Sequence, residues 1–148
     1  MGSPAALLKK LKAFNVDQAI DNAIEEHTAD YLVLQKDQLL RGLNSSGGNI
    51  KPQYADPYYA RKKNRMNSLP GLNNPDLKLT GARNEAMTVK LEGKEALKLD
   101  SDVEYNKYLE EQYGPGQIWS LTHENMGVFR REVRGSMQTI ITNETGLV

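Results

Sequence analysis

The feature that most constrains this chain is a row of side chains spaced for one face of a long helix. After Val16 the spacing alternates between four and three residues, as in a helix packed along a partner. The residues in this row are Ile20, Ile24, His27, Tyr31, Leu34 and Gln38. They predict one helix of about seven turns from Val16 to about Arg41, ending near Gly42. Such a helix is longer than average, so it must lie on the chain's own sheet or on a neighbouring subunit.

Composition narrows the class of protein. The 148 residues fit a single domain. With 19 basic and 19 acidic residues the net charge is zero, which disfavours general nucleic-acid binding. The chain has no cysteine, which excludes disulfides and thiolate metal sites. A mean hydropathy of −0.63 is low for a compact monomer, so we expect a polar arm or an apolar face buried on a partner.

Three regions follow from the local patterns. Residues 1–43 read as N-terminal helices, the first of which begins at Ser3 and Pro4. Residues 44–75 have no sustained period and contain repeated glycines and prolines, which predicts an extended arm. The arm should hold one short helix, capped by Asp56. It also carries Tyr54, Tyr58 and Tyr59, and tyrosines of this kind are favoured at interfaces.

Residues 76–148 read as an α+β core. Leu77 and Leu79 alternate with polar neighbours, and Thr80 is expected to cap a short helix that begins at Gly81. The segment TVKLEGKEALKL then predicts a β-hairpin around residues 92–94. Together with the helices on either side, this pattern predicts helices packed on a small antiparallel sheet.

Two more helices complete the predicted core. We expect Ser101 and Glu104 to form a capping box for the first, which presents Tyr105 and Tyr108 and ends at residues 114–116. The second should run from Thr122 to about Ile141. Its apolar face is spaced by three and four residues and comprises Met126, Phe129, Val133, Met137 and Ile140.

Signals of catalysis or cofactor binding are weak. The two histidines, His27 and His123, lack the spacing of a zinc motif, so we expect them to be structural or solvated. The glycines of SSGGN lack the pattern of a phosphate-binding loop, and no residues match the nucleophile motif of an esterase. The sequence therefore predicts a protein that is not an enzyme and uses no cofactor, metal or small-molecule substrate. No apolar run is long enough to predict a membrane span.

One segment mixes aromatic and basic residues. YYARKKNR holds Tyr58 and Tyr59 followed by four basic side chains, which are Arg61, Lys62, Lys63 and Arg65. Such a mixture can hold a phosphate backbone and stack a base, although a helix with a charged outer face explains it more simply. A third interpretation is contact with an acidic patch on a partner subunit. DNA binding through this segment would be salt-dependent and would weaken when Arg61, Lys62 and Lys63 are changed to alanine.

The sequence PDLKLTGARNEAM resembles the pLxxTGxLrxSi element of virion-morphogenesis and tail-completion proteins of tailed bacteriophages. In that family a β-hairpin, a tyrosine-bearing helix and a final helical segment follow. The matching parts here are TVKLEGKEALKLDSD, VEYNKYLEEQYG and IWSLTHENMGVFRREV, so the resemblance covers roughly Asp56 to Val133. The chain departs from the pattern at Ala82 and Arg83, where the family has a leucine before the arginine.

The resemblance implies a structural virion protein at the neck or the top of the tail, assembled in the bacterial cytoplasm. Such subunits join head to tail as oligomeric rings, contacting themselves and portal, connector or tail proteins. An alternative is a DNA-binding packaging or connector accessory that uses residues 58–65. The residues we expect at assembly contacts are Tyr54, Tyr58, Tyr59, Arg61, Lys62, Lys63, Arg65, Leu79, Thr80, Gly81, Tyr105 and Tyr108.

Overall fold

A computed structural model describes residues 2–78, 81–93 and 97–147. Within these ranges the chain forms helices and one two-stranded antiparallel sheet, which confirms the predicted α+β class. The elements in chain order are α1 (Pro4–Ala13), α2 (Val16–Glu26), α3 (Thr28–Leu40), α4 (Pro57–Met66), α5 (Ala82–Ala86), β1 (Met87–Leu91), β2 (Leu97–Ser101), α6 (Asn106–Tyr113), α7 (Pro115–Ile118) and α8 (His123–Thr145).

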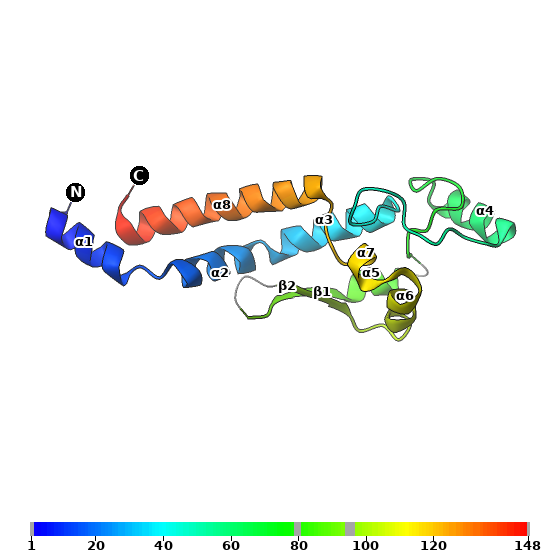
Figure 1. Cartoon of the computed structure of the whole chain (residues 1–148), viewed down its shortest axis with the longest axis horizontal. Helices are drawn as coiled ribbons and strands as arrows, with labels where there is room; N and C mark the ends of the chain where they lie inside the picture. Colours follow the sequence, from blue (N-terminus) through cyan, green and yellow to red (C-terminus); the bar gives the residue numbers. More distant parts are fainter. Residues whose placement is uncertain (1, 79–80, 94–96, 148) are drawn as a thin grey trace.

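The molecule is elongated, and α2 and α3 run along its length between two partners (Figure 1). On one side lies α8, which runs antiparallel to them, and on the other lies the hairpin. The helix face predicted from spacing is the one that packs here, because Tyr31 meets Phe129 of α8 edge to face at 5.1 Å. The seam of the long helix is therefore covered by the chain itself.

The prediction of one uninterrupted helix from Val16 to Arg41 is wrong at His27. There the backbone leaves the helical range, with φ −109° and ψ 13°, and α3 begins at the next residue. The hydroxyl of Thr28 donates to the Glu25 carbonyl oxygen at 3.0 Å. Local bonds of this kind compete with the helical ladder and bend helices. The two halves still follow one line in Figure 1.

The hairpin has the predicted position. Its register pairs Met87 with Ser101 and Val89 with Leu99. The core consists of two clusters of buried side chains, and inward-facing residues of the hairpin pack against both of them. One cluster contains Leu39, Ile50, Leu77, Met87, Leu109, Tyr113, Ile118 and Trp119. The other contains Tyr31, Leu121 and Phe129.

Several predicted helix ends are confirmed. Ser3 accepts a hydrogen bond from the Ala6 N–H, Asp56 from the Tyr58 N–H and Thr122 from the Asn125 N–H. Gly114 ends α6 with φ +81°. The last helix continues past the predicted Ile141 to Thr145.

The predicted capping box at Ser101 and Glu104 is wrong. Ser101 is the last residue of β2, it is buried, and its hydroxyl donates to the Arg83 carbonyl oxygen at 3.0 Å. The helix begins only at Asn106, without a side-chain cap. The expected cap at Thr80 and the expected anchor at Leu79 lie outside the described residues. The helix after them is α5, and Gly81 stands at its N-cap with φ +90°.

Gly42 closes the end of α3 and precedes the arm, and it supports a test of how the arm is held. Its φ is +72°, and an added Cβ would lie 2.5 Å from the Pro70 Cβ and 2.8 Å from the Pro75 carbonyl oxygen. We expect Gly42→Ala to lower the free energy of unfolding by about 2–4 kcal/mol, because backbone strain adds to overpacking. Urea denaturation measures this loss.

Gly47 provides the matched control. Its φ is +85°, yet an added Cβ would meet nothing within 4 Å. Gly47→Ala should therefore cost only the backbone term, about 1 kcal/mol. Equal losses in the two variants would show that the packing of Gly42 against the arm contributes nothing.

Candidate functional site: the arm and its anchor

The arm, residues 44–75, is fixed to the core by an ion pair at its base. The Lys63 Nζ of α4 lies 2.7 Å from the Asp76 Oδ1, and both side chains are almost fully buried. Lys63 also donates to the Lys78 carbonyl oxygen. A buried charge is tolerated only when it is paired and hydrogen-bonded, which is the arrangement here. Lys63 is therefore part of the anchor, and it does not belong to the outer basic face on which we expected it.

Asp76 connects the arm to the end of α3 as well. Its Oδ1 accepts from the Lys78 N–H at 2.9 Å, and its Oδ2 accepts from the Asn67 side-chain amide at 3.0 Å. The same Asn67 amide donates to the Leu40 carbonyl oxygen at 2.7 Å. One carboxylate thus fixes both the middle of α4 and the residue that ends it.

Tyrosines surround this ion pair. Tyr54 and Tyr59 meet edge to face, with ring centroids 5.0 Å apart. With Tyr113 of α6 they line a cavity of about 220 Å³ that also borders Lys63. Burial raises the pKa of Tyr54, and the nearby Asp76 charge adds to this. Burial, followed by Tyr59, raises the pKa of Tyr113 to about 12. These phenols therefore stay neutral at physiological pH.

The other predicted contact residues divide into inward and outward groups. Tyr105 is half-buried, and its hydroxyl accepts from the Arg83 N–H at 3.0 Å. Tyr108 of α6, which we expected at an assembly contact, is 62% exposed. The packed residues of α6 are Asn106, Leu109 and Tyr113.

The outward side of the arm carries apolar and basic side chains together. Tyr58 and Met66 of α4 are 67% and 66% exposed, and Leu69 and Leu72 follow at 58% and 52%. Arg61, Lys62 and Arg65 are exposed on the same helix. An open hollow of about 540 Å³ is lined by Tyr58, Arg61, Asn64, Arg65 and Leu72. We call Tyr58, Arg61, Arg65, Met66 and Leu72 the arm face.

Sequence reasoning missed the role of Arg83. Its side chain is 1% exposed, its Nε donates to the Asn106 side-chain oxygen at 2.9 Å, and its guanidinium lies 4.5 Å from the centre of the Trp119 ring. Burial lowers the pKa of Arg83, while the nearby Glu110 opposes this. No local motif in the sequence indicates that Arg83 is buried, because its partners Asn106 and Trp119 lie 23 and 36 residues further along the chain.

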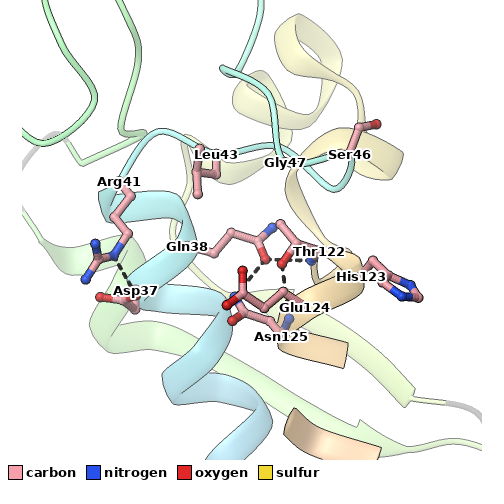
Figure 2. A pocket seen from close by; sticks show the side chains of 10 residues that line it. All are labelled: Asp37, Gln38, Arg41, Leu43, Ser46, Gly47, Thr122, His123, Glu124 and Asn125. Carbon is pink, nitrogen blue, oxygen red and sulfur yellow. Dashed lines mark hydrogen bonds and ion pairs between the residues drawn. The ribbon is translucent and has the colours of Figure 1, made fainter. Parts of the chain in front are cut away.

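Figure 2 shows a polar cavity of about 550 Å³ between the end of α3 and the start of α8. Gln38 crosses it, donating to the Ser120 carbonyl oxygen and accepting from the Thr122 N–H and the Asn125 amide. Asp37 is paired with Arg41 at 2.8 Å. Among the described residues that line the cavity, no hydrogen bond joins a nucleophile to His123. Gln38 therefore holds the start of α8 against the end of α3.

Comparisons with known protein families, curated proteins and solved structures find no match. Over the described part of the chain, no helix combines the length and the apolar character needed to cross a membrane. The functional interpretation therefore rests on the chain's own surfaces.

The buried ion pair at the base of the arm gives a prediction about stability. Lys63→Ala leaves the Asp76 carboxylate buried without its cation, and we expect a loss of about 3–5 kcal/mol in the free energy of unfolding. Combining Lys63→Met with Asp76→Asn removes both charges and should recover part of that loss; the recovery is incomplete because the amide nitrogen cannot accept the hydrogen bond of the oxygen it replaces. Chemical denaturation with urea measures all three proteins.

The neighbouring Lys62 is exposed and serves as the control. Lys62→Ala should change stability by no more than about 0.5 kcal/mol. If Lys63→Ala proved as mild as Lys62→Ala, the ion pair would not anchor the arm.

Proposed function

We propose that this chain is a structural subunit that assembles by contacts between different surfaces of successive copies. The observation that carries the proposal is the arm face, which exposes large apolar and basic side chains on an anchored projection. Interfaces are enriched in tyrosine, methionine and arginine, and depleted in lysine. A projection of this composition is suited to protein contact.

The charges of the chain support contact between copies. Helix α4 has no acidic residue, and three of its basic side chains are exposed, which are Arg61, Lys62 and Arg65, while the fourth is buried in the ion pair with Asp76. The stretch 100–111 contains five acidic residues and one lysine, which gives −4. Its exposed acidic residues are Asp100, Asp102, Glu104 and Glu111, and the exposed Tyr108 lies among them. We call this set the acidic patch.

The arm face and the acidic patch are different surfaces of one chain. Contact between them across two copies is therefore heterologous, and repeated contacts of this kind close into a ring or extend into a filament. Opposite charges favour encounter and fix the register, while the apolar side chains contribute affinity. A net charge of zero fits this arrangement, because each copy supplies both partners.

We propose a place for this subunit at the neck or the top of the tail of a tailed bacteriophage. The support is the resemblance of PDLKLTGARNEAM and the segments after it to virion-morphogenesis and tail-completion proteins. Portal, connector or tail proteins would be its other neighbours. Detection of the chain in purified particles, by mass spectrometry and by labelled antibodies viewed in the electron microscope, tests this placement. Its absence from complete particles would overturn the placement without affecting self-association.

DNA contact is a second candidate for the same face. The observation that favours it is the exposure of Tyr58 beside Arg61, Lys62 and Arg65. DNA affinity at low salt that falls steeply with added salt would support this candidate. If the protein self-associates and binds no DNA at low salt, the subunit contact remains the function of the arm face.

Charge reversal tests the contact between copies. We expect Arg61→Glu with Arg65→Glu to weaken self-association at least tenfold, and Glu104→Lys with Glu111→Lys to do the same. Mixing the two variants should restore association. The intact arm face of one variant meets the intact acidic patch of the other, and the reversed arm face meets the reversed patch, so both contacts pair opposite charges. A doubly reversed chain, which carries all of these substitutions, should also associate. Light scattering over a range of protein concentrations gives the mass.

Arg130→Glu with Arg131→Glu on α8 is the matched control, since it makes the same change of charge on another exposed surface. This control should associate like the unmodified protein. A wild-type protein that stays monomeric at all accessible concentrations, or a control that loses association equally, would contradict the proposed contact.

A further inference from the structure

We infer that His27, Asp30 and Glu132 bind a divalent transition-metal ion of the zinc class where the α2–α3 junction meets α8. One ligand atom from each residue lies within 4.8 Å of the other two. An imidazole nitrogen with two carboxylate oxygens is a donor set used by zinc and by neighbouring first-row metals. The inference is independent of the proposed subunit contact.

The imidazole is held in the orientation that such a site needs. The His27 Nε2 lies 2.6 Å from the Ser136 Oγ of α8. The His27 Nδ1 faces the two carboxylates, 2.7 Å from the Asp30 Oδ2 and 3.9 Å from the Glu132 Oε2. In a metal-binding histidine the second ring nitrogen donates to a neighbouring oxygen and fixes the tautomer. Ser136 supplies that oxygen. At 2.7 Å the Nδ1 carries a proton and donates to Asp30 in the metal-free protein, so a bound ion would displace that proton and take the Nδ1 lone pair.

Glu132 supplies an independent observation. Its Oε2 is buried and has no hydrogen-bond partner, although the side chain as a whole is 40% exposed. The 3.9 Å to the His27 Nδ1 exceeds hydrogen-bond length. A carboxylate oxygen in this position is costly unless a cation is near it. An ion between Nδ1 and Oε2 would remove that cost.

The required movements are small. Ligands bonded at the usual distances in a tetrahedron lie about 3.3–3.6 Å apart. The Nδ1–Asp30 separation must therefore widen by about 0.6–0.9 Å and the Nδ1–Glu132 separation must shorten by about 0.3–0.6 Å. Both carboxylates are partly exposed, so their side chains can move. The adjoining hollow of about 360 Å³, lined also by Glu26 and Thr139, has room for water as a fourth ligand.

Three neighbouring residues also have the arrangement of a hydrolase triad. Two short contacts link Ser136 to His27 and His27 to Asp30. Two features oppose that chemistry. Ser136 lies inside α8, where the backbone N–H groups are used by the helix and cannot form an oxyanion hole. Glu132 adds negative charge beside the site, which would destabilise an oxyanion but stabilises a cation. The geometry therefore favours the metal ion.

A zinc titration of the full chain tests the inference. Isothermal calorimetry on the chelator-treated protein should give one equivalent of Zn²⁺ per chain, and Co²⁺ should give the visible absorption of a low-coordinate site. Glu132→Gln and His27→Ala should each weaken Zn²⁺ binding at least tenfold, which matches the usual loss of a ligand or of its support. Ser136→Ala should weaken it less, because it only orients the ring.

His123→Ala is the matched control, because it removes the other histidine of the chain and leaves the cluster intact. It should bind Zn²⁺ like the unmodified protein. Glu132→Gln keeps the shape of a partly exposed side chain, so it reports on binding even if His27→Ala fails to fold. Unchanged affinity in Glu132→Gln, or lost affinity in His123→Ala, would overturn the site. Covalent labelling of Ser136 by a fluorophosphonate in the metal-free protein would overturn it in favour of the hydrolase triad.

Discussion

The fold depends on α2 and α3, which follow each other along the molecule and pack against two different partners. Helices α2 and α3 pack on α8 along one side and on the β1–β2 hairpin along the other. Few side chains of the 23-residue α8 are fully buried, and α1 buries none. Most of the apolar burial is therefore concentrated around Tyr31, Phe129 and the residues near Trp119. The ends of the molecule consequently depend on polar links more than on a core.

The polar links explain where the arm and α8 begin. Gln38 holds the start of α8 through three hydrogen bonds. Asp76 holds α4 through Lys63 and Asn67, and Asn67 donates in turn to the Leu40 carbonyl oxygen at the end of α3. Gln38 and Asp76 are both buried groups with satisfied partners, so loss of one partner costs much more than loss of an exposed pair. Gln38 thus fixes the start of α8 and Asp76 fixes the arm against the core.

Local chemistry made several elements predictable, and contacts that the sequence pattern does not reveal decided the rest. The caps at Ser3, Asp56 and Thr122 follow from short motifs and were found as expected. The break at His27 coincides with the bond from the Thr28 hydroxyl to the Glu25 carbonyl oxygen, which the apolar spacing does not reveal. Ser101 failed as a cap because pairing with Met87 extends the strand to that residue. At Ser101 a tertiary contact overrode a valid local signal, whereas at His27 a local side-chain bond interrupts a regular apolar spacing.

In the candidate site, too, some features were predictable from the local sequence and others depended on contacts between distant residues. Tyrosines and basic residues in the arm could be recognised as unusual from the sequence alone. The sequence alone could not show that Lys63 is buried while Arg61 is exposed. The burial of Lys63 depends on its ion pair with Asp76, which lies thirteen positions further along the chain. The His27 cluster was also hidden, since no spacing rule relates His27 to Glu132. Proximity in space created both features.

Anchoring at Asp76 changes how the arm would enter a complex. A loose segment loses conformational entropy when it docks, which weakens binding for a given area. Here folding of the subunit has already fixed α4 against α6 and α3. A partner would therefore bind a rigid arm whose direction is already fixed by the fold. The angle between successive subunits, and with it the curvature of any assembly, would be determined by the structure of the single subunit.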